Sequence, residues 1–212
     1  MVRYYLVIPV AVGLIAGIFA AMYFANPQND ELTMSKILEI SSPYEGNSAA
    51  PITIIEFGDY QCTFCYKFHG SSLGTIKDEY VETGKASLIF VDFPLNGPDS
   101  VLAAEASHCA KDQGKFWEYH DQLYNNWKGE RTGWINNDSL NVFAQGIGLD
   151  LETFNSCLES AKYRQQVLDT YDLGQEIGIN ATPSFLIVYG DEIVKITGNQ
   201  PIDVFRKTLD SM

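Results

Sequence analysis

An α/β fold built on a parallel strand–helix–strand unit is predicted by three stretches of this 212-residue chain. The apolar run Ile52–Phe57 is typical of a central strand that is buried on both faces, and Ala86–Val91 is a second run of the same kind. Between them, residues 62–83 can form a helix, which Gly84 would end. Two strands joined in this way are expected to be parallel and connected by a right-handed crossover.

A helical insertion and a C-terminal hairpin complete the expected fold. From about residue 97 to 178 the pattern changes to helical periodicity, broken by glycines and polar stretches, which predicts four or five short helices. Strand character returns at Ser184–Tyr189 and, after a glycine turn, at Glu192–Ile196. A last helix is expected at Ile202–Leu209.

The N-terminal segment, residues 1–26, is predicted to be a transmembrane anchor. The run from Tyr4 to Ala25 carries no charge and would extend about 33 Å as a helix, against a hydrocarbon core of roughly 30 Å. A cleaved signal peptide is the alternative, but the run exceeds the usual apolar region of such peptides and has the bulky Phe24 where a small residue is needed. Because Arg3 precedes the run, the N-terminus is expected to be cytoplasmic and the rest of the chain extracytoplasmic.

Residues 27–50 are expected to be a linker, and residues 51–212 the compact domain. The stretch Ser41–Ser48 is rich in turn-forming residues, and Pro51 directly precedes the first strand. A chain of this length with 46% hydrophobic residues can bury one well-packed domain plus an appendage.

The charge balance argues against nucleic acid as a partner. The chain has 27 acidic and 14 basic residues, a net charge of -13, and its basic residues form no run. A phosphate backbone would be repelled by such a surface, so no nucleic-acid binding is expected.

The pair Cys62 and Cys65 is the strongest chemical signal in the chain. Cysteines three apart on the first turn of a helix can bridge, and the unpaired N–H groups of that turn favour a thiolate on Cys62. Half of a zinc site or a small structural bridge would be the alternatives. The other cysteines and the histidines offer no second closely spaced ligand pair, so thiol–disulfide exchange is expected, with no metal and no cofactor.

Residues 51–209 resemble the thioredoxin fold in its DsbA-like form, which carries a helical insertion. The resemblance is carried by Glu56-Phe57-Gly58-Asp59-Tyr60-Gln61-Cys62-Thr63-Phe64-Cys65, by Gly114-Lys115-Phe116-Trp117 and by Gly178-Ile179-Asn180-Ala181-Thr182-Pro183-Ser184-Phe185. It implies a cis bond before Pro183, packed opposite the dithiol, with the backbone of Thr182 open to an extended substrate segment. The chain departs from the family pattern at Thr63-Phe64, where many members have Pro-His, so the resemblance does not fix the redox potential of the dithiol.

The resemblance also implies supporting roles outside the dithiol. Glu56 would be a buried acid that exchanges protons with Cys65, the alternative being a solvent-facing strand residue. Cys109 and Cys157, in two different predicted helices, would form a structural disulfide, the alternative being two buried thiols. Apart from the resemblance, the spacing of seven residues places His69 on the same helical face as Cys62 and makes it a weaker candidate for a thiolate partner.

The sequence therefore predicts an extracytoplasmic thiol–disulfide oxidoreductase tethered to the lipid bilayer by its N-terminal helix. Its expected activity is that of a dithiol oxidase acting on thiols of exported proteins or peptides through Cys62 and Cys65, with reoxidation by a membrane partner of the DsbB or VKOR type. A reductase or isomerase is the first alternative. A tethered binding module or holdase without catalysis is the second.

Overall fold

The computed structural model describes residues 27–212, with side chains from residue 33 onward. The expected transmembrane anchor, residues 1–26, lies outside the described residues. Among the helices from residue 27 onward, none combines the length and apolar character that a membrane crossing requires. The first described element is helix α2, Pro27–Ile40, and residues 40–212 form a compact unit of their own.

A four-stranded sheet runs through this compact unit, with the strand order β2-β1-β3-β4 within the described residues. Strand β1 (Ile52–Gly58) is parallel to β2 (Ala86–Asp92), as the crossover unit predicted. Strands β3 (Ser184–Tyr189) and β4 (Glu192–Thr197) form the predicted hairpin, and β3 pairs antiparallel with β1. Glu56 therefore lies on a central strand, between Phe90 of β2 and Phe185 of β3.

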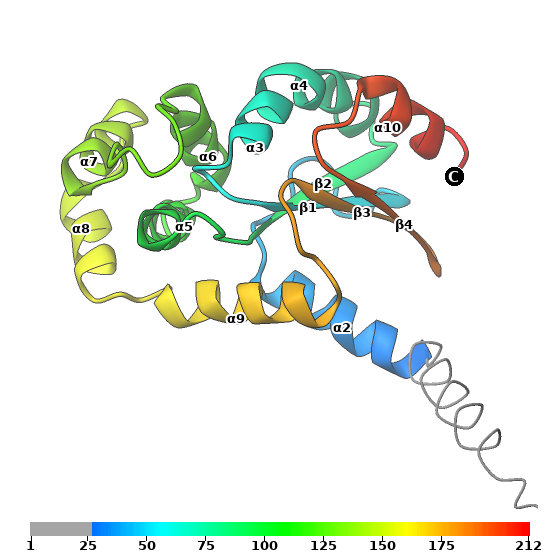
Figure 1. Ribbon diagram of the computed structural model, residues 1–212, viewed down its shortest axis with the longest axis horizontal. Coiled ribbons are helices and arrows are strands. Elements are labelled where there is room, and N and C mark those ends of the chain that lie inside the picture. Colours follow the sequence, from blue (N-terminus) through cyan, green and yellow to red (C-terminus); the bar gives the residue numbers. More distant parts are fainter. Residues whose placement is uncertain (1–26) are drawn as a thin grey trace, which may run out of the picture. The chain divides into compact units, whose positions relative to one another are not determined.

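One face of the sheet is covered by the helix that follows β1 and by α10, Ile202–Leu209 (Figure 1). The first of these begins as α3, Thr63–Phe68, and continues to residue 81 through two π-type turns and the short α4, Gly74–Ile76. Three phenylalanine rings hold this layer together, with centroids 4.6 to 5.5 Å apart: Phe68, Phe185 and Phe205. The helix starts one residue later than predicted, because Cys62 has an extended backbone and serves as its N-terminal cap.

Helix α9, Arg164–Glu176, lies on the opposite side of the sheet from α3 and α10 (Figure 1). Gly174 allows its close approach, since a Cβ atom there would lie 2.7 Å from the ring of Phe93 and 3.6 Å from that of Phe57. A side chain at this position would push the helix away from the sheet.

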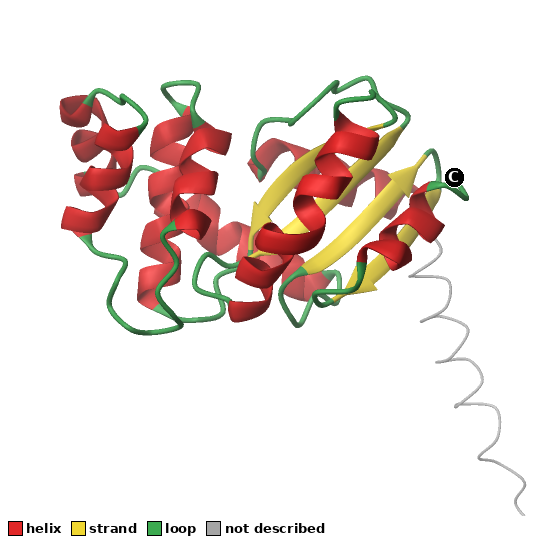
Figure 2. Ribbon diagram, turned by 90° about the horizontal axis from the view of Figure 1, so that it is seen from above, coloured by secondary structure: helices red, strands yellow, loops and turns green. Residues whose placement is uncertain are grey.

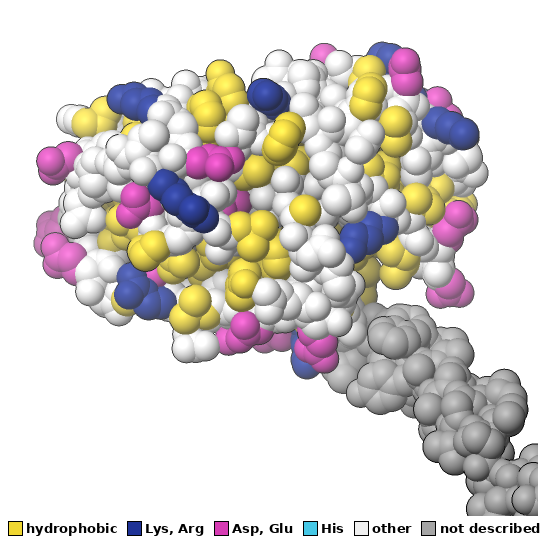
Figure 3. All heavy atoms as spheres, viewed as in Figure 1, with side chains coloured by type: hydrophobic (Ala, Val, Ile, Leu, Met, Phe, Trp, Pro, Cys, Tyr) yellow, Lys and Arg dark blue, Asp and Glu magenta, His cyan; other side chains and the backbone are white. Residues whose placement is uncertain are grey.

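The helical insertion occupies the region predicted for it, and Figure 2 shows its helices before α9 beside the sheet. It contains five helices: α5 (Pro98–Lys111), α6 (Phe116–Asn125), α7 (Asn137–Gly146), α8 (Leu151–Glu159) and α9. Helices α7 and α8 begin at the side-chain caps Asn136 and Asp150. On the face drawn in Figure 3, basic side chains lie among acidic ones rather than in a patch of one sign.

The expected linker, residues 27–50, differs in the structure. Residues 27–40 are the helix α2 rather than an irregular linker. Ser42 and Glu45 are hydrogen-bonded to β2, at Phe90 and Leu88, so the segment after residue 40 belongs to the domain. Turn-forming residues indicated a tether, but this segment covers the outer edge of β2, whose backbone groups would otherwise lack partners.

Candidate active site

The two cysteines of the Cys-x-x-Cys motif lie at the N-terminal end of α3, directly after the loop that follows β1. Both are free thiols, and Cys62 is 6% exposed while Cys65 is fully buried. The first backbone hydrogen bond of the helix runs from the Tyr66 N–H to the Cys62 carbonyl at 3.0 Å. The N–H groups of the three residues between them are thus free of helical partners and point toward the N-terminal end.

The two thiols differ in acidity. The largest influence on the Cys62 pKa is a hydrogen bond from the Cys65 side chain, which lowers it. The Thr182 side chain and the N–H groups of Cys65 and Phe64 lower it further. Together these groups outweigh the effect of burial, and the Cys62 pKa is about 7. Burial is the main cause that raises the pKa of Cys65 well above its ordinary value. At neutral pH a large fraction of Cys62 is therefore the thiolate, and Cys65 stays protonated.

The loop before β3 faces Cys62. The Thr182–Pro183 peptide bond is cis, as the resemblance implied. The Cys62 Sγ lies 3.4 Å from the carbonyl oxygen of Thr182, and the Pro183 carbonyl accepts a hydrogen bond from the Gly198 N–H at 2.7 Å. Among residues 33–212, none accepts a hydrogen bond from the Thr182 N–H. The backbone beside the sulfur thus retains a donor for another chain.

Glu56 lies beneath the dithiol on β1, and it is 3% exposed. Burial, and after it the charge on Cys62, raises its pKa to about 8, while the positive charge of Lys77 opposes this rise. No residue within the range 33–212 forms a hydrogen bond with its carboxyl group. A carboxyl with this pKa changes protonation state in the pH range where thiol exchange takes place.

Asp59 organises the loop between β1 and the dithiol. Its carboxylate accepts backbone hydrogen bonds from Gln61, Leu95 and Asn96 at 2.7 to 2.8 Å. It also accepts the hydroxyl of Ser100 at 2.7 Å. Burial raises the pKa of Asp59 although these hydrogen bonds oppose it. Its position matches that of an orienting residue rather than that of a proton donor to sulfur.

A loop of the helical insertion, residues 126–136, packs against the residue before Cys62 and was not anticipated from the sequence. The Trp127 Nε1–H donates to the Gln61 carbonyl at 2.9 Å, and the Arg131 N–H donates to the Gln61 Oε1 at 2.8 Å. The Glu130 Oε1 accepts the N–H of Thr63 at 2.8 Å. No local sequence pattern links a loop to a motif more than 60 residues earlier, so these contacts become visible only in the fold.

Cys109 of α5 and Cys157 of α8 are joined by a disulfide, with an S–S distance of 2.02 Å. They are 48 residues apart in the chain, and the bond links two helices of the insertion. This is the pairing that the resemblance implied.

His69 contacts the insertion rather than Cys62. Its Nε2 lies 3.1 Å from Asp121 Oδ1, and the His120 Nδ1 lies 3.3 Å from the same oxygen. The possible ligand atoms of these three residues lie within 4.8 Å of one another, close enough to suggest a metal site. However, Lys77 places a positive charge 4.0 Å from Asp121, and the other ring nitrogen of His120 is buried without a partner, whereas metal-bound imidazoles normally have that nitrogen hydrogen-bonded. The cluster is better described as a polar network between two helices.

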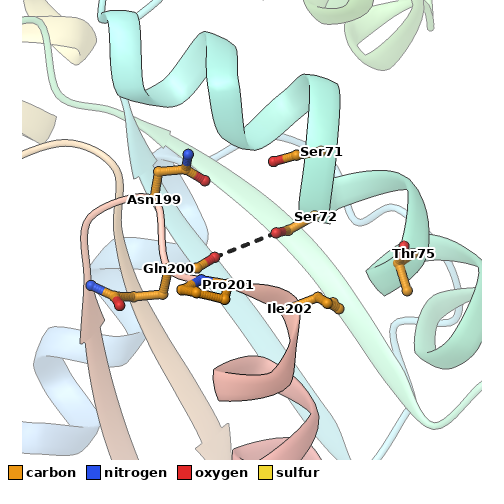
Figure 4. Close-up of a pocket in the computed structure, with 7 residues that line it drawn as sticks. All are labelled: Ser71, Ser72, Thr75, Asn199, Gln200, Pro201 and Ile202. Carbon is orange, nitrogen blue, oxygen red and sulfur yellow. Dashed lines mark hydrogen bonds between the residues drawn. The ribbon is translucent and has the colours of Figure 1, made fainter.

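A pocket of about 410 Å³ lies between the active-site helix and the loop before α10 (Figure 4). Gly198, at the start of that loop, donates to the Pro183 carbonyl, so the pocket adjoins the cis-proline loop. Its lining is mixed: Ser71, Ser72, Thr75, Asn199 and Gln200 contribute hydroxyl and amide groups, and Pro201 and Ile202 contribute apolar surface. The hydroxyl and amide groups can hydrogen-bond polar atoms of a bound peptide.

The chain is similar to known proteins in sequence and in fold. A family model described as thioredoxin matches residues 39–211. Probable disulfide bond formation protein D from Bacillus anthracis is 31% identical over 169 residues, which cover 78% of this chain and 75% of that protein. The oxidised crystal structure of BdbD from Bacillus subtilis has a TM-score of 0.72 and 28% identity, covering 80% of this chain and 91% of that one. Alpha-DsbA1 from Wolbachia pipientis has a TM-score of 0.71 and 26% identity, covering 82% and 94%.

Proposed function

The chain belongs to the thioredoxin family and is a DsbA-like thiol–disulfide oxidoreductase, and on this premise we propose that it is a dithiol oxidase that forms disulfides in exported proteins. One observation carries the thiol–disulfide exchange on which the proposal depends: an acidic thiol, Cys62, lies at a helix N-terminus beside a buried protonated thiol, Cys65, and opposite the cis Thr182–Pro183 bond. The relatives named for disulfide bond formation favour the oxidative direction.

The proposed cycle begins with Cys62 and Cys65 joined as a disulfide. A client thiolate attacks the Cys62 sulfur, the Cys62–Cys65 bond breaks, and the electron pair of that bond leaves on Cys65. A second client thiolate then attacks the client sulfur of the mixed disulfide, and Cys62 leaves as a thiolate. The client gains a disulfide and loses two electrons, and the enzyme is left as the dithiol.

We assign Glu56 the proton transfers of this cycle. Cys65 leaves as a thiolate in a fully buried site, where its pKa is raised, so it must take up a proton quickly. A protonated Glu56, with a pKa of about 8, can supply that proton directly or through water. In the reverse step, when the dithiol is reoxidised, the Glu56 carboxylate would remove it.

We assign client binding to the surface around Cys62. The free N–H of Thr182 can donate a hydrogen bond to the backbone of an extended client segment, which would add as a strand, and the pocket between Ser72 and Gln200 can bind the residues that follow. Phe64, 55% exposed, and Tyr66, 39% exposed, follow Cys62 on the same helix and offer apolar contacts. Main-chain recognition of this kind suits an enzyme with many clients.

We further propose that residues 1–26 anchor the enzyme in the cell membrane, with the catalytic domain on the extracytoplasmic side. The uncharged run from Tyr4 to Ala25 and the position of Arg3 support this arrangement. A membrane protein of the DsbB or VKOR type would then restore the Cys62–Cys65 disulfide. The anchor would hold the dithiol close to such a partner.

A reductase is the second candidate, and the Cys62 pKa of about 7 is the observation that favours it. Strongly oxidising dithiols have a nucleophile with a pKa of about 3.5, and reducing ones have a value of about 7. The potential of the Cys62–Cys65 couple, equilibrated with glutathione, separates the two. An oxidase requires a value less negative than roughly -200 mV, and a value near -270 mV would identify a reductase.

Trapping of clients tests catalysis itself. Cys65→Ser should accumulate mixed disulfides between Cys62 and client proteins, because the resolving thiol is missing. Cys62→Ser should neither trap clients nor oxidise a reduced test protein. If Cys62→Ser instead keeps the full biological activity of wild type, the result would support a tethered binding module without catalysis.

A further inference from the structure

Two anionic groups share the positive end of helix α3. The N–H groups of Phe64 and Cys65 face the sulfur of Cys62 and lower its pKa. The N–H of Thr63, which is next to them, donates instead to the Glu130 carboxylate at 2.8 Å. An unpaired N–H group at a helix start stabilises whichever negative charge it faces, and two such charges placed together repel each other.

The loop holds this carboxylate in place from both sides. Trp127 and Arg131 are each hydrogen-bonded to Gln61, the residue before Cys62, at 2.9 and 2.8 Å. Gly129 has φ +106°, a conformation that favours glycine and that lets the chain turn directly before Glu130. The hydrogen bonds from Thr63 lower the pKa of Glu130, so it is ionised at neutral pH.

We propose that Glu130 is a positioning residue that sets the redox potential of the dithiol, by placing a fixed negative charge at the helix end that also stabilises the Cys62 thiolate. The inference rests on the proposed function, because it concerns the same dithiol. Reduction of the disulfide takes up two electrons and one proton and leaves a thiolate at Cys62 and a thiol at Cys65. A neighbouring carboxylate disfavours that thiolate, and with it the reduced form.

With Glu130 in place, the Cys62–Cys65 disulfide is a weaker oxidant than it would be if the helix end alone acted on Cys62. The positive charge of Arg131, on the same loop, helps to lower the pKa of Glu130, and the Arg131 Nε donates to the Asn96 carbonyl at 3.4 Å. The insertion, rather than the residues between the two cysteines, then adjusts the potential. Its loop can be varied without changing the dithiol or the sheet.

The test compares Glu130→Gln with wild type in the full chain. Glutamine keeps an oxygen that can accept the Thr63 N–H but carries no charge, so a purely structural role would leave the chemistry unchanged. We expect the Cys62 pKa to fall by about half a unit. At about pH 8 or above, where Cys62 is almost fully ionised, the equilibrium with glutathione should then shift about threefold toward the dithiol. At 29.6 mV per tenfold change for two electrons, the potential would rise by about 14 mV. Glu176→Gln, an exposed position on α9, is the matched control and should change neither quantity.

Ionic strength provides a second readout. A charge effect at an exposed residue should shrink between low salt and about 1 M salt, where the Debye length is about 3 Å. Glu130→Ala, which also removes the acceptor, should shift the potential in the same direction, with folding checked by circular dichroism. If Glu130→Gln and Glu176→Gln both match wild type in Cys62 pKa and potential, the proposal is wrong. If wild type itself exchanges no disulfides while the pKa still falls in Glu130→Gln, the proposed function fails and the role of Glu130 stands.

Discussion

The sulfur of Cys62 lies 3.4 Å from the carbonyl oxygen of Thr182, a residue 120 positions later in the chain. The contact joins the start of the active-site helix to the loop that precedes β3. It brings the nucleophile, its hydrogen-bonding partner and a free backbone donor into one small area. Most of the proposed chemistry depends on this meeting of two distant segments.

Replacing Thr182 with valine should weaken the thiolate. The side chains are similar in shape, but valine cannot donate the hydrogen bond that lowers the Cys62 pKa. Loss of a hydrogen bond worth about 1 kcal/mol corresponds to a rise of about 0.7 pKa units. The ultraviolet absorbance of the thiolate, followed against pH, measures this change. Thr208→Val, whose hydroxyl bonds only to its own helix, is the control, and an unchanged Cys62 pKa in Thr182→Val would contradict the assignment.

The two active-site thiols should react at very different rates with iodoacetamide. Alkylation of the reduced enzyme should rise with pH with a midpoint of about 7, because only the thiolate of Cys62 reacts. Cys65 should remain unmodified throughout this range, since it is fully buried and its pKa is raised. Mass spectrometry of the labelled peptides identifies the modified cysteine. Preferential labelling of Cys65 would reverse the roles that we assign.

Substituting Glu56 with glutamine should stabilise the reduced protein at alkaline pH. The folded-state pKa of Glu56 is raised from 4.5 to about 8, so its contribution to stability is present below pH 4.5 and is lost as the pH rises to 8. At 1.36 kcal/mol per unit, Glu56→Gln should gain up to about 4 kcal/mol near pH 8 and little near pH 4. Urea unfolding at both pH values measures the difference. Glu159→Gln, an exposed position, should show no such pH dependence.

The same substitution should slow proton transfer to Cys65. Glutamine cannot donate or accept the proton, so the release of Cys65 from the disulfide should become slower by about tenfold or more. Stopped-flow measurement of the reaction with a small thiol, as a function of pH, tests this role. A wild-type rate in Glu56→Gln would leave Glu56 with an effect on stability alone.

Removing the second disulfide should lower stability without changing the redox chemistry. Cys109 and Cys157 close a loop of 48 residues, for which the chain-entropy model gives about 4 kcal/mol. The double variant Cys109→Ala/Cys157→Ala should therefore unfold at a lower urea concentration. The potential of the Cys62–Cys65 couple should stay unchanged, and a large shift in it would show that the insertion and the active site are coupled through this bond.

Local sequence patterns were sufficient to predict the strands and helices around the site. Strands β1 and β3 are mostly apolar, and β3 and α10 begin and end where the sequence placed them. The glycine after the active-site helix, Gly84, adopts the positive φ that was expected of a helix end. The segment after residue 40 was mistaken for a linker, because its turn-forming residues contain no sign of the pairing with β2.

The sequence by itself determined the nucleophile and the family, because a dithiol at the start of a helix and the strand before it are encoded in consecutive residues. Only the tertiary structure decided which groups surround the sulfur. Thr182, Glu130 and Gln61 come together through the sheet and the insertion, and acidity depends on burial and on charges that are distant in the chain. The sequence therefore predicted that Cys62 reacts, and the fold decides how strongly its thiolate is favoured.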